Sequence, residues 1–268
     1  MASTMSQRAV LKSALAAGEK GIGYWLTIPG PAVVRALTGI GGFNWVLIDG
    51  EHGQINDKDF YELSCAVAAA GASPIVRVPN AEEYMVKRAL DCGAHGIMTP
   101  MCHSAEDAKK VVAWNKYPPT GTRGFGPMFA GHAFGVSEGE YAQNADSECL
   151  VMVQIESQRG VDSVEEIAAV PGLDVLFVGP FDLSKSMNVP FGSKEHQDAI
   201  ARILMAAHDN GKTAAIFCSN GEQARQRLEQ GFDMVSIHTD IGVIVQGMTR
   251  ELGIATGKTQ EKKSGGYS

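Results

Sequence analysis

Apolar runs of strand length alternate with amphipathic segments along almost the whole chain. Eight runs rich in Val, Ile and Leu have the near-continuous hydrophobicity of strands that are buried on both faces. The segments between them carry apolar residues at helical spacing, as over residues 82–92 and 198–210. The eight runs cover residues 21–28, 45–49, 74–78, 96–101, 150–155, 175–179, 213–218 and 234–238.

Eight strand–helix units within 268 residues predict an α/β fold of the TIM (β/α)8 barrel type. We expect one domain over residues 1–256, with an extra N-terminal helix over residues 5–17 that closes the bottom of the barrel. A doubly wound open sheet is the alternative. Residues 257–268 are rich in Lys, Gly and Ser and are expected to form a disordered tail.

One interval, residues 117–147, is longer than the others and predicts an inserted loop and helix. Long loops in compact barrels often form an active-site wall or an oligomer contact, although a surface excursion fits the composition equally well.

Composition excludes several classes of function. The net charge of −7 leaves no basic stripe for nucleic acid. The longest apolar stretches have the length of strands, so no membrane span is predicted, and the N-terminal residues lack a signal-peptide apolar block. The five cysteines are scattered without CxxC spacing, which favours reduced thiols in a cytoplasmic protein over disulfides or zinc ligands.

Two acidic residues stand where successive apolar runs stop. Glu156 follows the run at 150–155, and Asp182 comes shortly after the run at 175–179. An unpaired buried carboxylate is costly, so packing gives no reason for either residue. Two hard oxygen ligands at neighbouring strand ends suit a divalent cation, Mg²⁺ or Mn²⁺ with Co²⁺ as a further option. We interpret the pair as a metal site.

Three more polar residues end predicted strands and could act beside such a metal. The Arg77 guanidinium could stabilise an enolate oxygen. His52 could serve as acid or base, directly or through a water, and Asp49 could orient its imidazole. Each residue also has a structural interpretation, Arg77 with Asp49 as an ion pair and His52 as an ordinary loop histidine.

The positions of the lysines argue against imine chemistry. A Schiff-base lysine normally projects from a strand into an apolar pocket, and none of the eight apolar runs contains a lysine. Lys185 is expected in a loop after Asp182, and Lys212 precedes the seventh run, at the wrong end of the barrel. A metal-assisted enolate route is therefore favoured.

Five motifs together resemble the HpcH/HpaI aldolase family, the class II pyruvate aldolases. The resemblance runs from about residue 21 to residue 253. The matching segments are FNWVLIDGEH at 43–52, VRVP at 76–79, YPPTGTRG at 117–124, VQIE at 153–156 and GPFDLS at 179–184.

This resemblance implies a divalent-metal-dependent aldolase that cleaves or forms 4-hydroxy-2-oxo acids through a pyruvate enolate. By resemblance, Glu156 and Asp182 hold the metal, Arg77 binds the pyruvate oxygen, and His52 with Asp49 forms the acid–base dyad. The residues implied in substrate binding are Gln154, Gly179, Pro180 and Asp91, the last reaching into a neighbour's site. The family further implies a homohexamer, a trimer of dimers with exchanged C-terminal helices.

Departures from the family pattern concern the second substrate, the aldehyde. The family has a short residue, usually Ala or Asn, where this chain has Phe181, and the loop at 125–135 is bulkier and more aromatic.

Two alternative functions stay open. One is an oxaloacetate decarboxylase or a C–C bond-forming enzyme that resembles macrophomate synthase. The other is a non-catalytic barrel that binds a 2-oxo acid.

Overall fold

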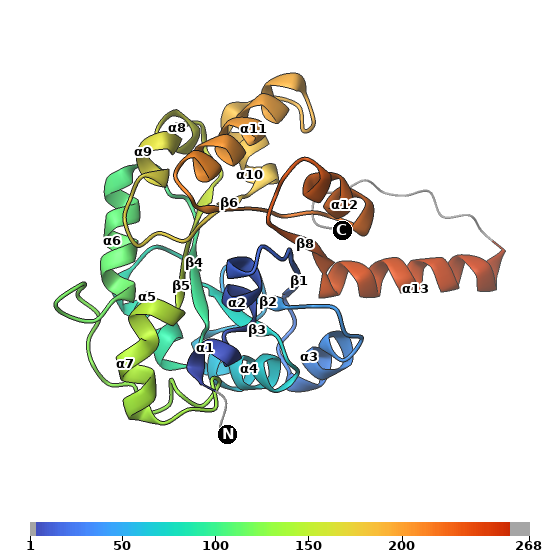
Figure 1. Ribbon diagram of the computed structural model, residues 1–268. Helices are drawn as coiled ribbons and strands as arrows, with labels where there is room; N and C mark the ends of the chain where they lie inside the picture. Colours follow the sequence, from blue (N-terminus) through green and yellow to red (C-terminus); the bar gives the residue numbers. More distant parts are fainter. Residues whose placement is uncertain (1–3, 258–268) are drawn as a thin grey trace.

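The computed structural model describes residues 4–257 and shows a closed barrel of eight parallel strands in sequence order (Figure 1). The predicted barrel is confirmed, the open-sheet alternative is wrong, and the strand ends differ from the predicted ones by two residues or fewer. The strands are β1 (Gly21–Leu26), β2 (Trp45–Asp49), β3 (Ser73–Arg77), β4 (Gly96–Thr99), β5 (Leu150–Ile155), β6 (Val175–Val178), β7 (Thr213–Ile216) and β8 (Met234–Thr239).

Helices surround the barrel and bury the outward-facing strand residues. The described residues form α1 (Met5–Arg8), α2 (Val10–Ala16), α3 (Pro31–Thr38), α4 (Asp57–Ala69), α5 (Glu83–Asp91), α6 (Ala105–Asn115), α7 (Glu138–Glu148), α8 (Gln158–Asp162), α9 (Val164–Ala168), α10 (Pro180–Met187), α11 (Lys194–Asp209), α12 (Gly221–Glu229) and α13 (Asp240–Thr256). A separate cluster fills the barrel interior with large side chains, including Trp25, Trp45, Met152 and Phe177. The interior is thus a packed core, and any cavity must lie at its ends.

The bottom of the barrel is closed as predicted, but by two short helices instead of one. The chain bends at Ala9 (φ −77°, ψ 64°), between α1 and α2. Leu11 then enters the interior cluster, and its backbone N–H donates to Ser73 Oγ at 2.9 Å. The closed bottom leaves the opposite end of the barrel for a site.

Two further expectations concern the long interval and the C-terminus. The interval contains a loop followed by α7, as predicted.

Helix α13 projects away from the barrel (Figure 1) and exposes Val245, Met248 and Ile254 among other apolar side chains. Of the predicted disordered tail, residues 258–268 lie outside the described residues. No helix within the described residues is long and apolar enough to cross a membrane.

Candidate active site

The predicted site residues gather at the end of the barrel where the strands terminate. Strands β2 and β3 pair with Asp49 opposite Arg77, so both side chains lie at the same level of the barrel. Strands β5 and β6 are neighbours, and Glu156 directly follows β5. Asp182 belongs to the first turn of α10, which begins two residues after β6. Parallel pairing therefore brings residues that are distant in sequence to one end of the barrel.

Arg77 is buried at the centre of this group and is held on several sides. Its Nε and Nη2 donate to the two carboxylate oxygens of Asp49 at 2.9 and 2.7 Å. Its Nη1 donates to Gln154 Oε1 at 3.2 Å. The guanidinium carbon lies 4.3 Å from the centre of the Trp25 ring, within cation–π range. Burial alone would lower the pKa of Arg77, but the charge and hydrogen bonds of Asp49 together with the charges of Glu51 and Glu156 outweigh it, and the pKa is raised.

Two carboxylates of the β2 end organise the turn that carries His52. Asp49 Oδ1 accepts the backbone N–H groups of Glu51 and His52 at 3.1 and 3.2 Å. Glu51 Oε2 lies 2.7 Å from Arg77 Nη1, a charge contact without hydrogen-bond geometry. The His52 side chain is 55% exposed, with Nε2 3.9 Å from Glu51 Oε1. Asp49 thus contacts Arg77 and the His52 backbone, and its role in orienting the imidazole stays a prediction.

Glu156 is buried and its two oxygens have fixed partners. Oε1 accepts the backbone N–H of Met101 at 2.8 Å, and Oε2 accepts Nε2 of Gln154 at 2.9 Å. Met101 adopts the left-handed region (φ 55°), which an ordinary side chain rarely occupies. Such strain persists where the surrounding structure enforces it, often at functional sites. Gln154 links the Glu156 carboxylate to the Arg77 guanidinium.

The charges at this end of the barrel do not balance. Burial is the main reason why the pKa of Glu156 is raised to about 7. The charges of Asp182 and Glu51 act in the same direction, whereas the Met101 backbone hydrogen bond and the charge of Arg77 oppose the shift. Burial also raises the pKa of Glu51. The Arg77 guanidinium lies among the carboxyl groups of Asp49, Glu51 and Glu156. Asp182 adds a fourth negative charge that acts on Glu156 and Glu51. A divalent cation beside Glu156 would relieve this excess of negative charge.

The donor set fits a cation that keeps part of its hydration. Within residues 4–257 no group of three or more His, Cys, Asp or Glu side chains is placed to hold a metal ion. Glu156 and Asp182 could serve as two protein ligands of a cation whose shell is completed by water or substrate oxygens, as is usual for Mg²⁺. The residues present fit a hard divalent cation.

Gly179 makes room for the Glu156 carboxylate. A Cβ at this position would lie 2.1 Å from Glu156 Oε2 and 3.2 Å from Gln154 Nε2. The next residue, Pro180, begins helix α10 and so directs the chain towards Asp182. Gly179 therefore lies beside the Glu156 carboxylate, and Pro180 shares the first turn of α10 with Asp182.

A cavity of about 490 Å³ opens beside Arg77 at the mouth of the barrel. Arg77, Asp49 and His52 line it together with Trp25, and the remaining lining residues are Thr27, Ile28, Gly53, Gln54, Thr239 and Ile241. The cavity places a cation, an imidazole and an aromatic face around one space. This arrangement suits a small anionic substrate.

Two further predictions concern Asp91 and Lys185. Asp91 ends α5, just before β4, so it lies at the end of the barrel opposite to Glu156, where it accepts Arg123 Nη2 at 2.7 Å. Its predicted role in a neighbour's site stays a prediction. Lys185 was expected in a loop and lies instead on helix α10, because this helix begins directly after Gly179.

Sequence reasoning missed three contributors to the site. Trp25 stacks on Arg77, Glu51 contacts the same guanidinium, and the Met101 backbone N–H binds Glu156. Glu51 carried a usable signal, because it lies between Asp49 and His52 at a strand end. The other two depend on barrel packing and on one backbone conformation.

Both the sequence and the fold are similar to those of known proteins. Residues 22–246 match the model of the HpcH/HpaI aldolase/citrate lyase family. A 5-keto-4-deoxy-D-glucarate aldolase of Shigella boydii serotype 18 is 37% identical over 235 residues, which are 87% of this chain and 90% of that protein.

Two solved structures of similar proteins share the whole barrel. An HpcH/HpaI aldolase/citrate lyase family protein from Burkholderia cenocepacia is 36% identical, with a TM-score of 0.85 over 92% of this chain and 98% of that chain. Macrophomate synthase is 25% identical, with a TM-score of 0.83 over 94% of this chain and 89% of that chain.

Replacing Gly179 by Ala should weaken binding of Mg²⁺ or Mn²⁺ by about 10–100-fold, because the new methyl group displaces the Glu156 carboxylate. Calorimetric titration of the metal would measure the change. The matched control is Gly139→Ala, because a Cβ there meets no atom within 4 Å. Equal affinity in both variants, with Gly179→Ala folded by circular dichroism, would exclude Glu156 from the metal site.

Proposed function

Because the chain belongs to the HpcH/HpaI aldolase/citrate lyase family, we propose that it is a divalent-metal-dependent aldolase that cleaves or forms 4-hydroxy-2-oxo acids. The substrate acids yield a pyruvate enolate and an aldehyde. The observation that carries the proposal is the excess of carboxyl groups at the mouth of the barrel, where Asp49, Glu51 and Glu156 surround one guanidinium and Asp182 acts on Glu156. The relatives named as 5-keto-4-deoxy-D-glucarate aldolases support a dicarboxylic acid of this class as one substrate.

Glu156 and Asp182 would hold the metal, Mg²⁺ or Mn²⁺ with Co²⁺ as a further option. When bound, the cation supplies Lewis acidity to the carboxylate and keto oxygens of a 2-oxo acid. Gln154 donates a hydrogen bond to the Glu156 carboxylate and accepts another from Arg77 Nη1. The metal ligand and the cationic residue are thereby held in one hydrogen-bonded chain.

Arg77 would stabilise the negative charge that develops on the substrate oxygen. Asp49 fixes the guanidinium plane with two hydrogen bonds, and Trp25 covers one face. A donor that is already oriented needs no reorganisation when charge develops, so its contribution is largest in the transition state. The two carboxylates at Asp49 and Glu51 keep the guanidinium charged.

His52 would move the proton on the methyl carbon of pyruvate and on the alcohol of the aldol. It lines the cavity beside Arg77, and its ring is more than half exposed, so a substrate or a water can reach it. The backbone hydrogen bond from His52 to Asp49 fixes the turn that presents the ring.

The assembly and location are further proposals. We propose a homohexamer, a trimer of dimers, in which exchanged C-terminal helices cover the exposed apolar face of α13. In that assembly Asp91 would reach a neighbour's site, since it lies far from the metal carboxylates of its own barrel. The five free cysteines support a cytoplasmic location.

A second candidate reaction uses the same residues. Likeness to macrophomate synthase favours decarboxylation of oxaloacetate, followed by addition of the enolate to another acceptor. A non-catalytic barrel would be expected to lack part of the set, yet Glu156, Asp182, Arg77 and His52 are all present.

Replacing His52 by Ala should slow proton exchange at the pyruvate methyl group by about 10²–10⁴-fold, the usual worth of a positioned acid–base group. Oxaloacetate decarboxylation should fall much less, because loss of CO₂ generates the enolate without a base. Exchange into deuterated water and CO₂ release would measure the two reactions. His208→Ala is the control, since this exposed histidine pairs with Asp233. Equal loss in both reactions would remove His52 from this role.

Replacing Arg77 by Lys should lower aldol cleavage and oxaloacetate decarboxylation together, by about 10²-fold or more, because both pass through the same enolate. Lysine keeps the charge but cannot make the paired contact with Asp49. Steady-state kinetics should show the loss in kcat, and thermal unfolding would check that the buried site still folds. A normal kcat with only a raised KM would instead make Arg77 a substrate anchor.

A further inference from the structure

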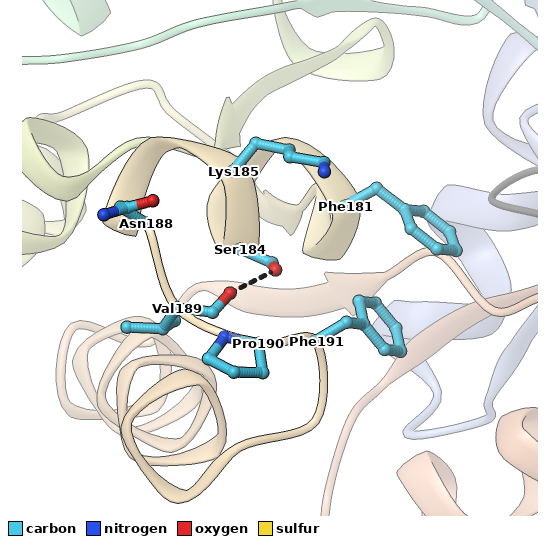
Figure 2. A pocket seen from close by; sticks show the side chains of 7 residues that line it. All are labelled: Phe181, Ser184, Lys185, Asn188, Val189, Pro190 and Phe191. Carbon is cyan, nitrogen blue, oxygen red and sulfur yellow. Dashed lines mark hydrogen bonds between the residues drawn. The ribbon is translucent and has the colours of Figure 1, made fainter.

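A second cavity, of about 400 Å³, lies beside helix α10 on the side of Phe181. Figure 2 shows the residues that line it: Phe181, Ser184 and Lys185 from α10, and Asn188 to Phe191 from the loop that follows. Phe181 and Asp182 are adjacent on the first turn of α10. The cavity is therefore next to a proposed metal ligand but outside the space lined by Arg77 and His52.

An unbroken series of aromatic contacts joins the two cavities. Trp25, beneath the Arg77 guanidinium, contacts the Phe217 ring at 5.0 Å between ring centres. Phe217 contacts Phe181 at 6.0 Å, and Phe181 stacks on Phe191 at 4.8 Å with 15° between the ring planes. One end of this aromatic wall faces the substrate cavity and the other lines the second cavity.

Hydrogen bonds between α10 and the loop after it fix the positions of Phe181 and Phe191 in this wall. Buried His196 donates from Nε2 to the carbonyl oxygen of Pro180 at 2.8 Å and accepts the Gly192 backbone N–H at Nδ1 at 3.1 Å. Ser184 Oγ donates to the carbonyl oxygen of Val189 at 2.8 Å, as drawn in Figure 2. The loop that carries Phe191 is thus fixed to the helix that carries Phe181.

One cation borders this apolar space. Lys185 follows Asp182 by one helical turn, and in Figure 2 its side chain extends in the direction of Phe181, whereas Asn188 points the opposite way. No acidic side chain within the described residues forms a salt bridge with Lys185. Its ammonium group is available to an anionic ligand.

From this geometry we propose that the second cavity is the acceptor subsite, and that it selects aldehydes with a flat apolar body and a terminal carboxylate. The inference rests on the proposed aldolase function. The enolate would form beside Arg77, and the aldehyde carbon would approach it past Asp182 with its apolar body against Phe181 and Phe191. Lys185 would bind the terminal carboxylate. Offset contact between flat rings and a charge-assisted contact are the interactions such a ligand needs.

The test compares three acceptors with pyruvate as donor: 4-carboxybenzaldehyde, benzaldehyde and glyoxylate. Each aldol addition rate is divided by the rate of oxaloacetate decarboxylation, which needs no acceptor, so a general loss of enolate chemistry cancels. In the wild-type protein the kcat/KM should rank 4-carboxybenzaldehyde above benzaldehyde by about 10-fold, the scale of a charge-assisted contact.

Two substitutions separate the parts of the subsite. Phe191→Ala should lower the normalised rate with both aryl aldehydes by about 10-fold relative to glyoxylate, because one ring of the wall is lost. Lys185→Met should abolish the preference for 4-carboxybenzaldehyde over benzaldehyde. Lys194→Met and Tyr84→Ala are the matched controls, since both side chains are exposed and neither lines the cavity, so the ranking should stay unchanged.

The outcomes distinguish this inference from the proposed function. An unchanged acceptor ranking in Phe191→Ala and Lys185→Met, with decarboxylation intact, would overturn the subsite and leave the aldolase standing. Absence of decarboxylation and of pyruvate exchange in the wild-type protein would overturn the function itself. Phe181→Ala provides a second variant if Phe191→Ala fails to fold.

Discussion

The burial of Glu156 at the mouth of the barrel is the constraint on which the site depends. A carboxylate in this position has lost most of its hydration, and the nearest cation, Arg77, is already shared between Asp49 and Glu51. Ionising Glu156 therefore costs free energy in the protein alone, as its raised pKa indicates. The fold keeps this unfavourable arrangement through Gly179, the Met101 backbone and Gln154, which is how structures built to bind a cation behave.

Two separate cavities open near this end of the barrel, one beside Arg77 and one beside Phe181. The carboxylates and Arg77 occupy the polar side of the barrel mouth, while Trp25, Phe217 and Phe181 form an aromatic boundary. Enolate chemistry needs the polar side, and choice of the second substrate can be made on the aromatic side. Variation at Phe181 or Phe191 could thus change the acceptor without disturbing the residues that hold the metal and the enolate.

Much of the fold could be predicted from sequence because parallel strands buried on both faces leave continuous apolar runs. The carboxylates at 156 and 182 were visible for the same reason, since each interrupts such a pattern. The break at Ala9, the left-handed Met101 and the contact of Arg77 with Trp25 could not be predicted, because backbone dihedrals and packing across the barrel decide them. The partner of Asp49 also required the structure, since the sequence allowed either Arg77 or His52.

Pyruvate release from oxaloacetate before and after removal of divalent cations tests the metal-dependent mechanism most directly. Full chelation should reduce the rate by about 10²-fold or more, since a Lewis acid contributes several kcal/mol of charge stabilisation. Added Mg²⁺ or Mn²⁺ should restore the rate in the wild-type protein but not in Glu156→Gln, whose fold is checked by circular dichroism. Full activity in demonstrably metal-free protein would contradict the assignment of Glu156 and Asp182 as metal ligands and the enolate mechanism built on it.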